Sequence, residues 1–214
     1  MGRWQREALT EGQGRDVAAP PPFASRTVPL PIAARQGGLA GYDRLLTLVR
    51  RGNRTSMKPL HEAAYNADLN AVKRLLDVGQ SVDDHDDAGY TPLLWSCLRG
   101  QVGDQIPIVQ ALLAAGADPD ALTAAKDANC LVLAVQSGNV ELMSQLIAAG
   151  ADLNAAADDV TPLMVAARDG NDEAVETMLA LGANAALIIG GFTAADYANY
   201  GGHDQLAVRL RMDG

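Results

Sequence analysis

The residues with the clearest potential for chemistry are a histidine and four aspartates in one run. The run reads Asp83-Asp84-His85-Asp86-Asp87, and imidazole and carboxylate groups are common metal ligands. Neighbouring residues of an extended segment point to alternating sides, and this spacing is not that of a calcium-binding loop. We therefore interpret the run as a solvated acidic loop, and we keep a metal-dependent or hidden enzymatic role centred on His85 as an alternative hypothesis.

Other patterns that support catalysis are missing from the sequence. It contains no glycine-rich phosphate-binding loop after a strand, no Cys-x-x-Cys pair and no Gly-x-Ser-x-Gly elbow. The two cysteines, Cys97 and Cys130, are predicted to be a reduced, buried pair. We expect no enzyme activity, and we assign no catalytic, cofactor-binding or metal-binding residue.

The elements that position these residues are set by a segment that recurs along the chain. Its copies begin at Lys58, Thr91, Asn129, Thr161 and Thr193, at intervals of 33, 38, 32 and 32 residues. A period of about 33 residues is typical of stacked helix pairs, each too small to bury its own apolar face alone.

The fourth copy shows the local instructions most completely. Thr161 can cap a helix through its hydroxyl group, and Pro162 follows at the first helical position, where a missing N–H costs nothing. Gly170 ends this helix, and acidic residues from Asp172 onward favour the start of a second. Gly182 suits a left-handed cap at its end. Each copy is therefore predicted to form helix, turn, helix and an extended finger loop.

These motifs resemble the ankyrin repeat family. The copies keep its Thr-Pro-Leu-His start in part (Lys58-Pro59-Leu60-His61, Thr161-Pro162-Leu163) and its Gly-Ala-Asp ending (Gly116-Ala117-Asp118, Gly150-Ala151-Asp152). The resemblance implies an all-α solenoid over residues 57–212, with four repeats (57–90, 91–128, 129–160, 161–192) and a truncated cap (193–212). It also implies structural roles for His61 and His203.

Three departures from the family pattern stand out. An insertion of about four residues between Gly100 and Leu112 is expected to lengthen the turn between two helices. The third repeat begins Asn129-Cys130, a weaker helix start. The last unit ends early with a polar outer face, which suits a terminal cap.

Residues 1–56 differ in composition from the rest. Residues 1–38 are rich in Pro, Gly and Arg and are predicted to be a disordered leader. Residues 39–56 include Tyr42-Asp43-Arg44-Leu45-Leu46-Thr47-Leu48-Val49-Arg50-Arg51-Gly52-Asn53, which resembles the second helix of a degenerate repeat, and we expect a capping helix there. An alternative hypothesis is that translation begins at Met57.

Charge divides at the same boundary. Residues 1–56 hold nine arginines and four acids (+5), whereas the remainder holds eight basic and 22 acidic residues (−14), giving −9 in total. An acidic repeat region argues against binding of nucleic acid phosphates and is compatible with a basic partner protein. No apolar run is long enough to cross a membrane. We expect a cytoplasmic monomer without cofactors.

The family resemblance implies protein binding through a concave groove lined by finger tips and first helices. Either a scaffold or an inhibitor that masks a basic partner would fit. The apolar finger Leu187–Phe192 could be a contact site or could pack against its neighbour, and both interpretations stay open. The candidate partner-binding residues are Tyr65, Asn66, Asp87, Tyr90, Leu98, Arg99, Gln136, Arg168, Asp169, Ile188, Ile189, Phe192 and Tyr200.

Overall fold

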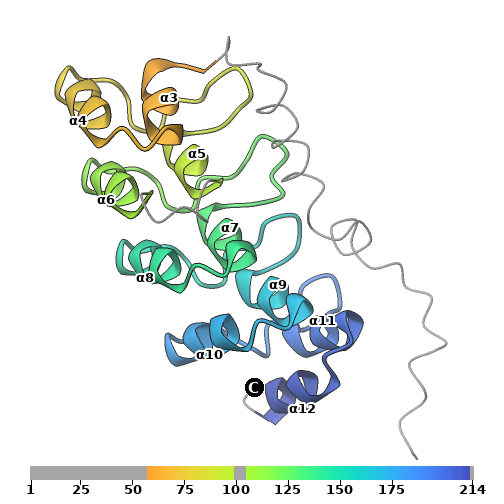
Figure 1. The fold of residues 1–214 in the computed structure, drawn as a ribbon. Helices are drawn as coiled ribbons and strands as arrows, with labels where there is room; N and C mark the ends of the chain where they lie inside the picture. The colour runs from red at the N-terminus through yellow and green to blue at the C-terminus, as the bar shows by residue number, and fades with distance from the viewer. Residues whose placement is uncertain (1–56, 99–104, 213–214) are drawn as a thin grey trace, which may run out of the picture.

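The molecule is a stack of helix pairs. The computed structural model describes residues 57–98 and 105–212. The first helices of the pairs form one row: α3 (Pro59–Tyr65), α5 (Pro92–Leu98), α7 (Cys130–Ser137), α9 (Pro162–Asp169) and α11 (Ala194–Gly201). The second helices form the other: α4 (Leu69–Asp77), α6 (Ile106–Ala114), α8 (Val140–Ala148), α10 (Asp172–Ala180) and α12 (Asp204–Met212). Finger loops lie on the side of the first row away from the second helices (Figure 1), and the predicted all-α ankyrin solenoid is confirmed.

Side-chain caps mark the starts of the first helices except α3, which begins at Pro59 without one. The Thr161 hydroxyl accepts a hydrogen bond from the Met164 N–H at 3.2 Å, as expected. The Asn129 carboxamide oxygen accepts one from the Val132 N–H at 2.9 Å. The third repeat, which has Asn129-Cys130 in place of Thr-Pro, therefore has a side-chain cap of the same kind. At the other end of α9, Gly170 adopts the left-handed conformation, with φ of 65°, which is favourable because glycine has no Cβ.

Equivalent positions of the second helices share one burial pattern. The fourth residue of each is fully enclosed. These residues are Val72, Val109, Met143, Val175 and Ala207. Together with the buried stripes of the first helices, they form a continuous hydrophobic core along the stack, as expected for repeats that depend on their neighbours.

Successive units are also joined by an inter-repeat ladder of hydrogen bonds between side chains and backbone. Asp83 accepts from the Asp118 N–H at 3.0 Å, Asp120 from the Asp152 N–H at 3.1 Å, and Asn154 from the Asn184 N–H at 3.0 Å. Burial and the neighbouring carboxylates raise the pKa of Asp120, although the Asp152 N–H opposes this. Each rung fixes the loop after one second helix against the same loop of the next unit.

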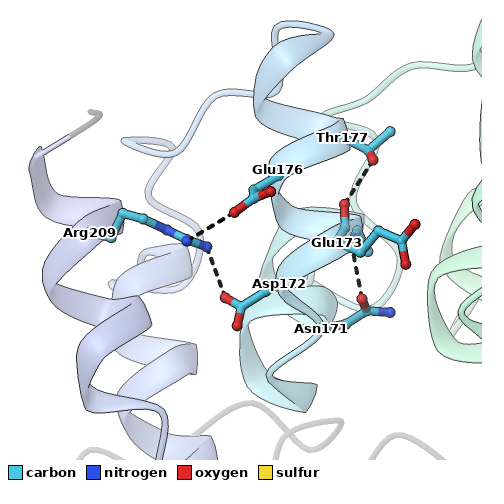
Figure 2. Close-up of polar contacts among 7 residues, drawn as sticks. Asn171, Asp172, Glu173, Glu176, Thr177 and Arg209 are labelled. Carbon is cyan, nitrogen blue, oxygen red and sulfur yellow. Dashed lines mark hydrogen bonds and ion pairs between the residues drawn. The ribbon is translucent and has the colours of Figure 1, made fainter.

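The C-terminal unit is held to its neighbour by a charged contact. Arg209 of α12 donates to Asp172 at 2.9 Å and to Glu176 at 3.2 Å, both on α10 (Figure 2). The predicted polar face of this last unit is therefore partly used within the molecule. These pairs are solvent-exposed, so each contributes only about 0.5 kcal/mol.

Several predictions fall on residues that the structure does not describe. They concern the leader (1–38), the capping helix (39–56), the candidate Arg99 and most of the insertion. The described ends of α5 and α6 are nevertheless separated by residues 99–105, whereas only Gly138 and Asn139 separate α7 from α8. The extra residues therefore lie between two helices of one unit, as predicted. Within the described ranges, no helix has the length and apolarity needed to span a bilayer.

Candidate functional site

Four finger loops and the last residues of the first helices form a continuous surface, which we call the finger face. Each finger is closed at its base by a backbone hydrogen bond from an N–H to a carbonyl oxygen. The pairs are Asp86 to Tyr90, Thr123 to Ala128, Ala157 to Val160, and Ile189 to Phe192. The fingers are therefore short, internally bonded loops, and their tips are held in fixed positions along the stack.

The acidic run of the first finger is divided among structural contacts. One oxygen of the buried Asp86 carboxylate accepts from the N–H groups of Ala88 and Tyr90, each at 3.0 Å. Its other oxygen accepts from the Trp95 indole nitrogen at 2.8 Å. Asp84 pairs with Lys58 at 2.6 Å, and this contact lowers the pKa of the carboxyl group.

His85 stays exposed while its acidic neighbours turn to these different partners. Within residues 57–98 and 105–212, no group of three or more His, Cys, Asp or Glu side chains is arranged to hold a metal ion. His61, in contrast, is buried, and its Nε2 lies 2.9 Å from the Asp84 carbonyl oxygen. Burial lowers the pKa of this imidazole. Its contact bridges the first helix and the finger, which is the structural role that the resemblance implied.

An aromatic cluster occupies the N-terminal end of the finger face. The Trp95 ring lies 5.7 Å from that of Tyr65, nearly edge-on, and 5.3 Å from that of Tyr90. Tyr90 is only 8% exposed, so the expectation that it lies on the surface is wrong. The physical reason is that Trp95 provides a large apolar surface, which the tyrosine at the finger base covers.

The two C-terminal fingers are tight two-residue turns of opposite character. Asp158 and Asp159 form the tip of one, with φ of 47° and 59°. Gly190 and Gly191 form the tip of the next, with φ of 58° and 88°. Positive φ suits glycine, whereas it strains aspartate by about 1 kcal/mol or more per residue. The aspartate tip is therefore maintained against its backbone preference, and it presents two carboxylates to solvent.

The sequence left two interpretations of the apolar finger open, and each one holds for some of its residues. Ile189 and Phe192 pack against the core, and the Phe192 ring meets that of Tyr197 edge-on at 6.4 Å. Ile188, in contrast, is 66% exposed. The base of the finger is thus internal packing, and its single large solvent-facing apolar side chain is Ile188.

Tyr197 occupies the same repeat position as Trp95, but its hydroxyl, unlike the Trp95 indole N–H, is not hydrogen-bonded to a described residue. Its side chain is fully buried, and its hydroxyl has no hydrogen-bond partner among the described residues. Burial raises the pKa of the phenol; Arg168 opposes the shift, whereas Asp158 and Asp159 add to it. The Arg168 side chain is only 10% exposed and pairs with Asp169 at 2.8 Å, so this predicted contact residue is largely committed to packing.

The remaining candidates show a gradient of exposure. Asn66, Asp87, Asp169 and Tyr200 are exposed, and Tyr65, Leu98 and Gln136 are half-buried at helix ends. Sequence reasoning did not name Trp95 or Tyr197, which organise the two ends of this face. Their shared position, fifth from the start of each repeat segment, was the available signal.

Two pockets are lined by described residues, one beside α12 and the other beside the start of α3. An open one of about 630 Å³ is bordered by Gly170, Asp172, His203 and Arg209 among others. Another of about 250 Å³ lies beside Lys58, His61 and Asp84. Cys97 and Cys130 are both free and buried. Burial and the contact with Cys97 raise the pKa of the Cys130 thiol, which makes that thiol a poor nucleophile.

Comparison with known proteins gives a consistent result. The protein-family model described as "Ankyrin repeats (3 copies)" matches residues 30–123, 101–188 and 131–210. Ankyrin repeat and SOCS box protein 14 of Mus musculus is 31% identical over 62% of this chain and 23% of its own length. Protein phosphatase 1 regulatory subunit 27 of Homo sapiens is 34% identical over 41% of this chain and 56% of its own length. DNA-binding protein RFXANK of Homo sapiens is 32% identical over 56% of this chain and 45% of its own length. The chain thus covers less than two thirds of each relative.

Proposed function

The chain belongs to the ankyrin repeat family, and from this premise we propose that it binds a partner protein through the finger face and catalyses no reaction. Ankyrin repeats are protein interaction modules, and relatives include a protein named as a phosphatase regulatory subunit. In the same proposal, the protein acts as a monomer in the cytoplasm. A reduced state of its two buried, contacting cysteines is part of the same proposal.

The observation that carries this proposal is the solvent exposure of charged and apolar side chains at the tips of the two C-terminal fingers. Asp158 and Asp159 form no hydrogen bond or ion pair with a described residue through their carboxylates, and they are held at a strained tip. The exposed Ile188 lies on the next finger. A partner that presents lysine or arginine beside an apolar side chain would complement both features.

A basic partner is the finer part of the proposal. Over the described residues, 20 acidic groups oppose seven Lys and Arg side chains, a net charge of −13. Such an excess speeds encounter with a basic surface and disfavours nucleic acid phosphates. An inhibitor that masks a basic partner therefore fits better than a scaffold with neutral partners.

Affinity capture from the native cell, followed by mass spectrometry, tests the proposal when matched baits are compared. Asp158→Asn with Asp159→Asn removes two charges and keeps residues that tolerate positive φ. Glu141→Gln with Glu173→Gln removes two charges from second helices, on the opposite side of each unit. We expect the first pair of changes to reduce capture of the specific partner at least tenfold and the second pair to preserve it.

An apolar variant tests the other half of the surface. Ile188→Asp should abolish capture with little change in Tm, because Ile188 is exposed. Capture by the wild-type bait should also weaken between low and high salt. Equal capture by all baits would contradict the proposed surface, and salt-independent binding would contradict the basic partner.

A further inference from the structure

Two buried thiols meet where the second repeat packs against the third. Cys97 lies near the end of α5 and Cys130 at the start of α7, and these two first helices pack side by side (Figure 1). Both side chains are enclosed, and the two thiols contact each other. The pairs at the same repeat positions elsewhere are Ala64 and Pro92, Val135 and Pro162, and Ala167 and Ala194. Among these four pairs, the cysteines alone can be joined by a covalent bond.

The same two repeats contain buried polar atoms that the closed stack leaves without hydrogen bonds. The Asn129 oxygen caps α7, but its Nδ2 has no partner among the described residues, and neither polar atom of the Gln105 side chain has one. Water would satisfy these three atoms if the second and third repeats separated, because burial without a partner destabilises a polar group. Local opening of these repeats therefore requires less free energy than their apolar burial alone would indicate.

We propose that Cys97 and Cys130 form a modification site, at which a hydroperoxide produces a reversible disulfide between the second and third repeats. In the resting protein the thiols stay reduced, because the closed stack excludes the oxidant. Opening of the two repeats exposes a thiol, and closing returns it to its partner.

The chemistry takes two steps. While the repeats are open, the sulfur of one thiol attacks the O–O bond of the hydroperoxide, and its proton ends on the leaving oxygen. This step gives a sulfenic acid and releases water or an alcohol. When the repeats close, the second sulfur attacks the sulfenic sulfur, and its proton leaves with the hydroxide as water. Two electrons pass from the sulfurs to the peroxide, and one S–S bond forms.

Contact between the thiols favours this product within one chain. A disulfide needs its two Cβ atoms about 4 Å apart, so thiols that already touch require only a small movement. Burial, the contact with Cys97 and the nearby Asp118 and Asp120 raise the pKa of the Cys130 thiol. Thiolate therefore forms rarely in the closed stack, and the rate of oxidation should follow the opening of the repeats.

Oxidation of the full-length protein with hydrogen peroxide tests the site. We expect a product whose peptides containing Cys97 and Cys130 are joined in a non-reducing map and separate again in dithiothreitol. Its Tm should rise by about 5 °C or more. Cys130→Ala, which introduces the residue found at the equivalent Ala194, should show no rise after the same treatment. Disulfides only between chains, sulfinic acid without a disulfide, or thiols still reduced after oxidation of the exposed Met212 would overturn the proposal.

A matched pair of variants tests whether local opening controls the rate. Asn129→Thr allows the kind of cap that Thr91 and Thr161 form and removes the unpartnered amide nitrogen. It should slow disulfide formation about fivefold. Tyr197→Phe also removes a buried group without a partner among the described residues, but from the last unit, and should change the rate less than about twofold. Equal slowing by the two variants would mean that only global unfolding exposes the thiols, and it would overturn the proposal.

Discussion

The two ends of the finger face use the same repeat position for different purposes. At the N-terminal end, Trp95 donates to Asp86, the residue five places before Thr91. At the C-terminal end, the residue five places before Thr193 is Ile188, and the hydroxyl of Tyr197 has no partner among the described residues. Asp86 therefore accepts the hydrogen bond of the Trp95 indole and fixes its own finger. Ile188, at the equivalent position, faces solvent, and the Tyr197 hydroxyl has no acceptor there.

This difference teaches how one surface can combine a hydrogen-bonded structural end with an end that leaves polar and apolar groups exposed. A buried polar group that is hydrogen-bonded stabilises a specific loop conformation. Replacing that group by an apolar one at the other end gives up the bond and creates exposed apolar area, which favours contact with another protein. The N-terminal finger is thus fixed by internal hydrogen bonds, and the C-terminal one carries the exposed surface that we propose for partner binding.

The largest expected effect is at the N-terminal end. Asp86→Ala should lower the free energy of unfolding by about 3 kcal/mol, because three donors would lose their acceptor in a buried site. Urea denaturation measures this change. The exposed neighbour Asp87 is the control, and Asp87→Ala should stay within about 0.5 kcal/mol. Similar values for the two variants would break the contrast between the ends.

Glycine substitutions should also distinguish the first finger from the last, by a smaller difference in the free energy of unfolding. Gly89 has φ of 78°, and a Cβ there would overlap the Ala124 side chain of the next finger. Gly191 has φ of 88°, but nothing lies near its added Cβ. Gly89→Ala should therefore cost about 2 kcal/mol and Gly191→Ala about 1 kcal/mol in denaturation experiments. A larger cost at Gly191 would show that the C-terminal finger is the more constrained.

The stability contributions of the two ends should change at opposite ends of the pH range, and these changes should be smaller than the effects of the substitutions above. Burial lowers the pKa of His61 from 6.5, so its contribution to stability is present above pH 6.5 and is lost as pH falls through the folded-state pKa. Burial raises the pKa of Tyr197 from 10.0, so its contribution is present below pH 10 and is lost as pH rises through the folded-state pKa. Thermal unfolding across pH should lose part of its acid slope in His61→Gln and part of its alkaline slope in Tyr197→Phe.

The smallest expected effect is at neutral pH. Tyr197→Phe removes a hydroxyl that has no partner, so the free energy of unfolding should change by less than about 0.5 kcal/mol or rise slightly. Trp95→Phe, which loses a hydrogen bond and ring volume, should cost about 2 kcal/mol. If Tyr197→Phe proved as costly as Trp95→Phe, the two rings would be equivalent and the comparison would fail.

Local features of the fold were predictable because they depend on neighbouring residues. The cap at Thr161, the left-handed glycine at Gly170 and the 32-residue spacing each follow from short-range chemistry. Positions of the second helices also follow, since burial repeats with the helical period.

The candidate site was less predictable because it depends on contacts across repeats. Burial of Tyr90 requires Trp95, which lies one helical turn into the next repeat segment, and the family pattern alone gave Tyr90 an exposed position. The split of the apolar finger likewise depends on Tyr197, against which Phe192 packs. Such side-chain contacts arise only once the units are stacked.

The inter-repeat ladder also bears on how such a chain can evolve. Each rung joins a side-chain acceptor of one unit to a backbone N–H of the next, and every residue except proline carries that donor. A duplicated unit would therefore form this hydrogen bond with the unit on either side, without compensating substitutions in its neighbours. The final unit of this type carries Ala186 where earlier ones carry Asp83, Asp120 and Asn154. Because the Ala186 side chain has no hydrogen-bond acceptor, it cannot supply a further rung.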